Sequence, residues 1–341
     1  MNGDPHSLEN HPVNDDAPLD RLPDRGSPEP SFIRFIFLGT EGLRAGWGLA
    51  LMLTLYTALG SVVGLRFWWL PGEHASLPRV AQSILWQDML LGDGIAFLCV
   101  LIATWIMSRI EGRPIGQYGF GGRRRIAHFG AGFAWGLVFL SLLVAALWAG
   151  GLLVFDGRLL AAIPALQYGA LWLLVFLTVG LVEEYLTRGY LQFTLTRGLR
   201  SLYGLFLGAK HRDLFGFWTA AVIMSLFFGL GHSGNPGETP LGLAAAGLIG
   251  LIFCLTLWRT GSLWWALGFH ASWDWAQSFL FGVADSGTMV QGHLFATHPT
   301  GKVLLSGGAT GPEGSALILP LIVAITGVVM LIPKEPQTSH L

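Results

Sequence analysis

Long apolar runs separated by short polar connections dominate the chain from residue 45 onward. A helix needs about 20 predominantly apolar residues to cross the hydrocarbon core of a bilayer. Eight runs come close to that length, at residues 45–69, 89–107, 130–154, 168–191, 214–232, 241–258, 263–283 and 315–332. Their even spacing predicts one all-α bundle of about eight transmembrane helices, and therefore a multi-pass integral membrane protein without a soluble domain.

The two ends of the chain break this pattern. Residues 1–30 are rich in Asp, Pro, Asn and Ser and contain no apolar run, so they cannot bury enough surface to fold alone. They also lack the basic and apolar regions of a signal peptide. We therefore expect a disordered cytoplasmic N-terminal tail at 1–40, a transmembrane domain at 41–335 and a C-terminal tail at 336–341.

Composition agrees with a membrane protein and narrows the classes of partner. Of 341 residues, 52% are hydrophobic and 12% are charged, and this charged share is about half of that in soluble domains. The sequence has no extended basic patch of the kind that binds nucleic acid. We therefore expect the lipid bilayer as a partner and no nucleic acid.

Lys and Arg are distributed unevenly between the connections. The two tails and the even-numbered connections hold fifteen of them, whereas the odd-numbered connections hold only Arg79, Arg158 and Lys302. Cytoplasmic loops of membrane proteins carry the excess of positive charge. Both termini are therefore predicted to be cytoplasmic, as an even number of spans allows.

The fourth apolar run ends with three ionisable residues, Glu183, Glu184 and Arg188. Carboxylates within a membrane helix are costly unless they are paired, hydrated or used. Glu184 and Arg188 are four residues apart and can pair on one helix face. Glu183 lies about 100° further round the helix without an obvious local cation, which suits a general base. The alternative is that all three residues only mark the helix end at the lipid headgroups.

Two further runs carry polar residues one helical turn apart. Phe228 and His232 end the fifth run, and His270 and Asp274 lie in the seventh. A single His in a span often serves helix packing, but three helices that each offer ionisable groups favour a shared site. Such groups could converge around a water molecule or a metal ion.

In this order on separate helices, the three motifs resemble those of the CPBP family (CAAX protease and bacteriocin-processing, or Abi) of intramembrane endopeptidases. They read Glu183-Glu184-x-x-x-Arg188, Phe228-x-x-x-His232 and His270-x-x-x-Asp274. The resemblance covers a motif core at 171–283, and the Gly-rich stretch 307–314 is also similar to bacterial members. It implies a membrane-embedded protease, a hydrolase acting on a peptide or a membrane-anchored protein. Prenylated tails, bacteriocin leaders and membrane-protein segments all stay open as substrates.

For individual residues, the resemblance implies that Glu183 activates water, with His232 beside it. It implies that His270 and Asp274 bind the carbonyl oxygen in the transition state. The other motif residues would be supporting, namely Glu184, Arg188 and Phe228. The family often has Asn at the position of Asp274. Because an ionised Asp cannot donate to an oxyanion, Asp274 is either protonated, or it orients His270 or binds a metal.

The sequence is compatible with a zinc cofactor and with no cofactor. Glu183, His232, His270 and Asp274 could together hold a tetrahedral zinc, as in a metalloprotease. The His-Glu-x-x-His pattern of many zinc proteases is missing from the sequence, so we favour glutamate-activated water without a metal. The alternative to an enzyme is a non-catalytic transporter or scaffold that uses the polar cluster for packing or ion binding.

The depth of the site raises a conflict. We expect cleavage near the cytoplasmic leaflet. In the predicted orientation Glu183 lies near the cytoplasmic end of its helix, whereas His232 lies about 25 Å from that side at about 1.5 Å per residue. Either the fifth helix begins deeper than residue 214, or the fourth helix continues past Arg188. We favour the second, because residues 189–199 keep an apolar face.

Overall fold

The computed structural model describes residues 36–39, 42–68 and 83–335. Most of the predicted N-terminal tail and the whole of the predicted C-terminal tail lie outside the described residues, as does Arg79. At the end of the predicted N-terminal tail, strand β1 (Leu38–Gly39) pairs antiparallel with β2 (Gly42–Leu43), which lies at the start of the predicted transmembrane domain.

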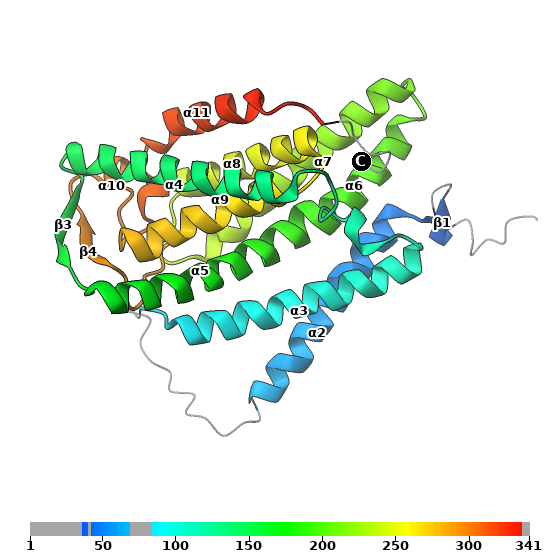
Figure 1. Ribbon diagram of the computed structural model, residues 1–341. Helices are drawn as coiled ribbons and strands as arrows, with labels where there is room; N and C mark the ends of the chain where they lie inside the picture. The colour runs from blue at the N-terminus through cyan, green and yellow to red at the C-terminus, as the bar shows by residue number, and fades with distance from the viewer. Residues whose placement is uncertain (1–35, 40–41, 69–82, 336–341) are drawn as a thin grey trace, which may run out of the picture.

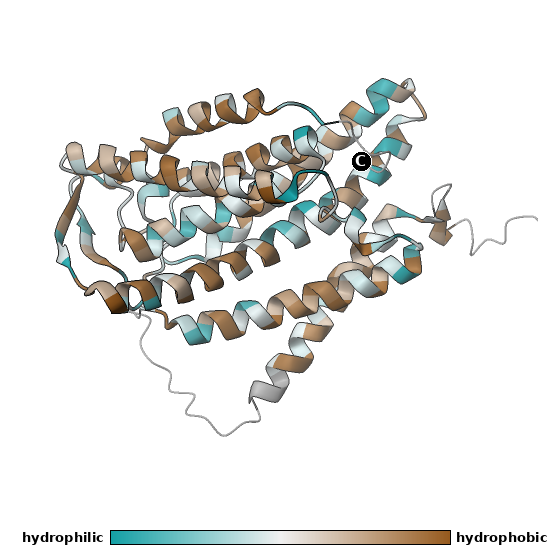
Figure 2. Cartoon of the chain, in the orientation of Figure 1, coloured by the Kyte–Doolittle hydropathy of each residue, from teal (hydrophilic) through white to brown (hydrophobic). Residues whose placement is uncertain are grey.

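Each of the eight apolar runs forms a helix, so the prediction of an all-α membrane bundle is confirmed (Figure 1). In chain order these helices are α2 (Ala45–Trp68), α3 (Trp86–Glu111), α4 (Arg125–Ala149), α5 (Ala162–Glu184), α7 (Ala209–Gly231), α8 (Pro240–Thr260), α9 (Trp264–Trp275) and α11 (Ile318–Leu331). In the described part of the chain, six helices are long and apolar enough to span a bilayer. Helix α11 is shorter, as is α9, which the π-helical segment η4 (Ala276–Leu280) prolongs. Apolar residues predominate along the bundle (Figure 2).

The fourth predicted helix continues well beyond Arg188, as expected from its apolar face. Helix α5 runs directly into the π-helical segment η2 (Tyr185–Leu191) and then into α6 (Gln192–Tyr203), which gives 42 helical residues in all. At about 1.5 Å per residue this is about 60 Å, twice a hydrocarbon core of about 30 Å. In η2 the Gln192 N–H donates to the Thr187 carbonyl, five residues back, the widened turn that often marks functional sites. Glu183 therefore lies near the middle of a long helix.

The third run departs from its prediction at its C-terminal end. Helix α4 stops at Ala149, and Gly151 takes a φ of +66°, a left-handed conformation that glycine adopts without steric cost. The chain then enters β3 (Leu153–Arg158), which pairs antiparallel with β4 (Phe295–Pro299). Residues 153 and 154, predicted to be helical, are therefore in a strand. The other short segments are η1 (Ile115–Gln117), η3 (His232–Gly234), α10 (Val303–Ser306) and η5 (Pro312–Gly314).

Helix α9 packs closely against both α4 and α5. A Cβ on Gly132 of α4 would lie 2.0 Å from the Trp265 carbonyl oxygen, and one on Gly268 of α9 would lie 2.1 Å from that of Phe129. Gly229 allows a similar approach of α7 to α8. Small residues at such crossings let membrane helices pack backbone to backbone. These crossings hold α9, which carries the third motif, against α4, and α7, which carries the second, against α8.

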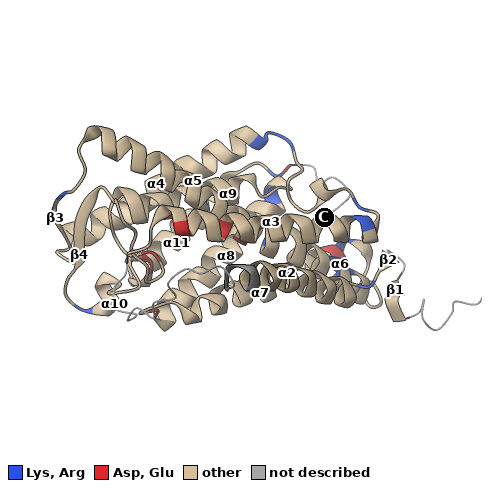
Figure 3. Cartoon of the chain, turned by 90° about the horizontal axis from the view of Figure 1, so that it is seen from below, with Lys and Arg blue, Asp and Glu red and all other residues tan. Residues whose placement is uncertain are grey.

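Charged residues are separated along the long axis of the bundle (Figure 3). Most described Lys and Arg residues gather at one end, around α6 and β2, whereas Arg158 and Lys302 lie at the end formed by β3 and β4. We call the first the basic end, made by the connections at 109–125, 192–212 and 259–262, and the second the strand end, made by those at 150–161, 232–239 and 281–317. That the basic end faces the cytoplasm stays a prediction.

Candidate active site

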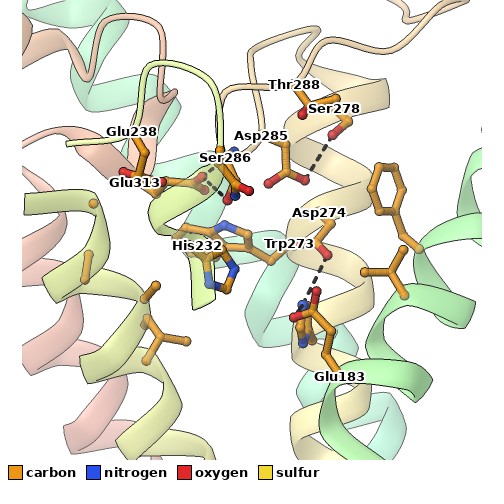
Figure 4. Close-up of a pocket in the computed structure, with 18 of the residues that line it drawn as sticks. Glu183, His232, Glu238, Trp273, Asp274, Ser278, Asp285, Ser286, Thr288 and Glu313 are labelled. Carbon is orange, nitrogen blue, oxygen red and sulfur yellow. Dashed lines mark hydrogen bonds and ion pairs between the residues drawn. The ribbon is translucent and has the colours of Figure 1, made fainter. Parts of the chain in front are cut away.

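The three motifs line one cavity of about 440 Å³ (Figure 4). Glu183 reaches it from α5, Phe228 and His232 from the end of α7, and His270 and Asp274 from α9. The fold therefore brings together all four residues proposed from the sequence as catalytic.

The predicted ion pair between Glu184 and Arg188 is present. Arg188 Nη1 lies 2.8 Å from Glu184 Oε1, and both side chains are fully buried. The guanidinium carbon lies 3.9 Å from the centre of the Phe228 ring, a cation–π contact. Gly250 of α8 leaves room for the guanidinium, since a Cβ there would lie 2.5 Å from Arg188 Nη2. Both members of the pair are thus fixed by surrounding side chains and backbone.

His270 is surrounded by carboxylates. Its Nδ1 lies 3.0 Å from Glu184 Oε1, the same oxygen that binds Arg188. Its Nε2 lies 3.3 Å from Asp274 Oδ2 and 3.7 Å from Glu183 Oε2. Because Glu184 is held by a buried arginine, its contact with Nδ1 fixes the orientation of the imidazole ring. Nε2 therefore faces the two carboxylates that line the cavity.

Glu183 differs from its neighbour Glu184 in both exposure and partners. Its side chain is 35% exposed and lines the cavity, and no ion pair with Lys or Arg is found for it among the described residues. Across the cavity, His232 Nδ1 lies 2.8 Å from the Phe228 carbonyl oxygen. A carbonyl can only accept, so Nδ1 donates and the neutral ring keeps Nε2 as an acceptor. Glu183 and His232 Nε2 are therefore both available to a ligand.

Further carboxylates, which the sequence analysis did not single out, line the cavity toward the strand end. They are Asp88, Glu238, Asp285 and Glu313. Ser278 Oγ donates to Asp285 at 3.1 Å, and Glu313 accepts from the Gln277 amide at 2.7 Å and from the Ser286 hydroxyl at 2.9 Å. Both Asp285 and Glu313 lie in the connection before α11, outside the spanning helices. Burial raises the pKa of Asp285 well above its usual range and that of Glu313 to about 7.

A sequence signal for Glu313 existed in the Gly-rich stretch 307–314. Gly311 has a φ of +113°, and a Cβ there would lie 2.1 Å from the Ala284 carbonyl oxygen. The glycine allows this turn to lie directly on the chain that follows η4, next to Asp285 and Ser286. The stretch therefore directs Glu313 toward the cavity, a role that only the folded arrangement reveals.

The four candidate metal ligands are not arranged as a zinc site. His270 contacts Glu183 and Asp274, but no contact joins His232 to any of these three in the part of the chain that the structure describes. No three of the described His, Cys, Asp and Glu side chains form a group that could hold a metal ion. As placed, the four side chains do not fit the tetrahedral centre that zinc prefers, and we derive no step through a metal.

Comparison with known families adds independent evidence. Residues 164–276 match the family model described as Rce1-like, type II CAAX prenyl endopeptidase Rce1-like. The match contains every motif residue from Glu183 to Asp274 and nearly the whole predicted motif core. No curated protein and no solved structure gives a match. Residues 164–276 are therefore an Rce1-like domain, and this domain matches the CPBP/CAAX protease family that the three motifs indicated.

Proposed function

We propose that this protein is an intramembrane endopeptidase in which Glu183 activates the attacking water. One observation carries the proposal: two adjacent carboxylates in the middle of a long membrane helix have opposite environments. Glu184 is fully buried in an ion pair with Arg188, whereas Glu183 is partly exposed to a cavity that also contains His232 and His270. A carboxylate without a fixed cation, facing a cavity with two imidazoles, is suited to take a proton from water.

In the proposed reaction, a water molecule lies between Glu183 and the scissile carbonyl. Glu183 takes a proton while the water oxygen attacks the carbonyl carbon, and a tetrahedral intermediate forms. Glu183 then returns the proton to the leaving amine, so its protonation state is restored at the end of the cycle. His232, whose Nε2 is free to accept, holds the water or the substrate N–H near Glu183.

The oxyanion is assigned to His270 rather than to Asp274. Carboxylates at both ring nitrogens favour the imidazolium form of His270, whose Nε2–H lies next to Glu183 and can donate to the developing negative charge. Asp274 Oδ2, 3.3 Å from that nitrogen, cannot donate while it is ionised. We therefore assign to Asp274 the task of holding the His270 ring in place, together with Glu184 at the opposite ring nitrogen.

The position of the cavity bears on the side from which a substrate enters. Outside the helices, its lining comes from residues next to or within strand-end connections, including Asn235, Glu238, Asp285 and Glu313. If the basic end is cytoplasmic, this cavity opens on the opposite side of the membrane. The expectation of cleavage near the cytoplasmic leaflet and the predicted orientation therefore conflict. We propose that the orientation holds and that the peptide enters from the non-cytoplasmic side.

The test is proteolysis by purified Glu183→Gln in liposomes, on a peptide library or on membrane-anchored test proteins that the wild type cleaves. Gln keeps the size and polarity of Glu but cannot accept the proton. We expect activity to fall by about 10²–10⁴-fold while thermal unfolding stays like that of the wild type. Asp156→Asn is the matched control, since Asp156 is an exposed carboxylate at the strand end that pairs with His298. Wild-type proteolysis by Glu183→Gln would rule out its role as the base.

A further inference from the structure

A second cavity, of about 590 Å³, lies at the basic end of the bundle. It is bounded by η2 and α6, by the connection between α3 and α4, and by parts of α7 and α8. Among the described residues that line it, none is Asp or Glu, and four are arginines, namely Arg113, Arg188, Arg197 and Arg200. The charge of this lining suits an anion.

One helix face supplies a row of hydrogen-bond donors to this cavity. Arg188, Gln192, Thr196 and Arg200 follow each other at intervals of four residues along η2 and α6, and all four line the cavity. Residues four apart lie one above the other on a helix. Along the cavity wall, the row therefore presents a guanidinium, an amide, a hydroxyl and a second guanidinium, each of which can donate a hydrogen bond.

Two members of this row are buried polar groups that lack a partner. Gln192 is 1% and Thr196 is 5% exposed. The Gln192 amide nitrogen and the Thr196 hydroxyl have no hydrogen-bond partner among the described residues, although Gln192 Oε1 accepts from Cys254 Sγ at 3.0 Å. Native proteins satisfy nearly all buried polar groups, so donors left open inside a cavity point to a ligand with acceptor oxygens.

The opposite wall is built from a Gly-rich connection. Gly116, Gly119, Gly121 and Gly122 all line the cavity between α3 and α4. Gly119 and Gly122 have φ values of +100° and +88°, which glycine adopts without strain. Arg113, Pro114 and Gln117 of the same connection also line the cavity, and at the glycines between and after them a ligand can approach the backbone closely.

Acidic groups near the arginines lie outside the lining. Glu111 is 3.5 Å from Arg197 and 3.8 Å from Arg113, and Asp213 is 2.8 Å from Arg200. Glu184 likewise pairs with Arg188. Two unsatisfied neutral donors and a planar guanidinium at each end of the donor row match a ligand that has several anionic oxygens.

We propose that this cavity is a binding site for a phosphate group, carried either by a lipid headgroup or by a soluble phosphate compound. Basic cavities between helices at the cytoplasmic side of membrane proteins are suited to phosphorylated headgroups. Thr196 and Arg200 do not line the candidate active site, so binding at this cavity can be tested separately from the endopeptidase activity. Arg188 belongs both to the lining of this cavity and to the ion pair that supports His270.

The experiment measures thermal stabilisation of the detergent-purified full chain by two probes, short-chain phosphatidic acid and inorganic phosphate. We expect a saturable rise of the unfolding midpoint with at least one probe. Thr196→Val removes one donor without changing charge or shape, and Arg200→Gln removes one end of the row. Each should weaken the apparent affinity by roughly tenfold, the effect of losing one hydrogen bond to a charged group.

Arg212→Gln is the matched control, because Arg212 also pairs with Asp213, at 3.5 Å, but does not line the cavity. Its response should equal that of the wild type. Stabilisation by phosphatidic acid alone would identify a lipid headgroup as the ligand, and stabilisation by inorganic phosphate as well would identify a soluble phosphate. An equal response of wild type, Thr196→Val and Arg200→Gln, or no response to either probe, would overturn the proposal.

Discussion

The two cavities of this protein differ in charge and in what their polar groups bind. The cavity toward the strand end is lined by six carboxylates and two histidines, and by no Lys or Arg among the described residues. The cavity at the basic end is lined by four arginines and, within the described chain, by no carboxylate. One continuous helix therefore serves two opposite electrostatic environments, because Glu183 of α5 faces one cavity while residues of η2 and α6 line the other.

The boundary between the cavities is the Glu184–Arg188 pair. Arg188 lines the basic cavity, while its partner Glu184 holds His270 at the edge of the other. Breaking a buried ion pair by removing one partner leaves an uncompensated charge. The pair therefore stabilises the helix between the two cavities and also fixes the orientation of His270.

The largest expected difference between the two ends is their accessibility from outside the cell. With Cys99 and Cys254 replaced by Ala, Lys302→Cys at the strand end should react with an impermeant thiol reagent in intact cells. Lys210→Cys at the basic end should react only after the membrane is opened. Both positions are exposed, so membrane sidedness decides the result. Labelling of Lys210→Cys alone in intact cells would place the proposed active site on the cytoplasmic side.

Next in size is the effect of Glu184→Gln on stability. Arg188 would stay fully buried without its anionic partner, and we expect the free energy of unfolding to fall by about 3–5 kcal/mol. Thermal unfolding in detergent measures this loss. Asp213→Asn is the control for a partly exposed pair, with Asp213 43% exposed beside Arg200, and should cost at most about 1 kcal/mol. Equal stability of Glu184→Gln and wild type would show that the Glu184–Arg188 pair does not stabilise the fold.

A smaller effect is expected for Asp274→Asn. If Asp274 holds His270, an Asn side chain can still do so, because its carbonyl oxygen accepts a hydrogen bond from Nε2. Its amide group can also donate to an oxyanion at any pH. Proteolysis should be retained or increased. With Asp274 as a zinc ligand, activity and metal affinity should instead fall by at least the roughly 10–100-fold seen when metal sites are disturbed. Steady-state kinetics and metal titration of the same variant distinguish these outcomes.

The smallest effect concerns pH and Glu313. Its folded pKa of about 7 lies above the ordinary value of 4.5, so the folded state binds more protons between these values. Its stabilising contribution is therefore complete below about 4.5 and is lost as the pH rises through about 7. Glu313→Gln should flatten the fall of the unfolding midpoint between pH 5 and about 8. A pH profile parallel to that of the wild type would show that Glu313 does not titrate in this range.

The sequence was sufficient for features that depend on local periodicity. The apolar runs located all eight helices, and the spacing of Glu184 and Arg188 indicated their ion pair. The apolar face of residues 189–199 indicated that the helix continues past η2. Each of these rests on interactions within one helix, which a sequence pattern records directly.

Other features depend on contacts between distant segments and were not predicted. Pairing of β3 with β4 joins segments on either side of five helices. Glu313 reaches the cavity only because Gly311 allows a turn against Ala284. The basic cavity needs a row of donors on α6 to face glycines between α3 and α4. None of these has a periodic signal of its own.

Zinc content and proteolysis, determined together on one preparation, decide whether Glu183 activates water in the strand-end cavity without a metal. We predict that wild-type protein cleaves substrate with less than stoichiometric zinc and keeps its activity after chelation, and that Glu183→Gln loses the activity. Stoichiometric zinc that is lost together with activity on chelation, and restored together with it, would contradict this mechanism.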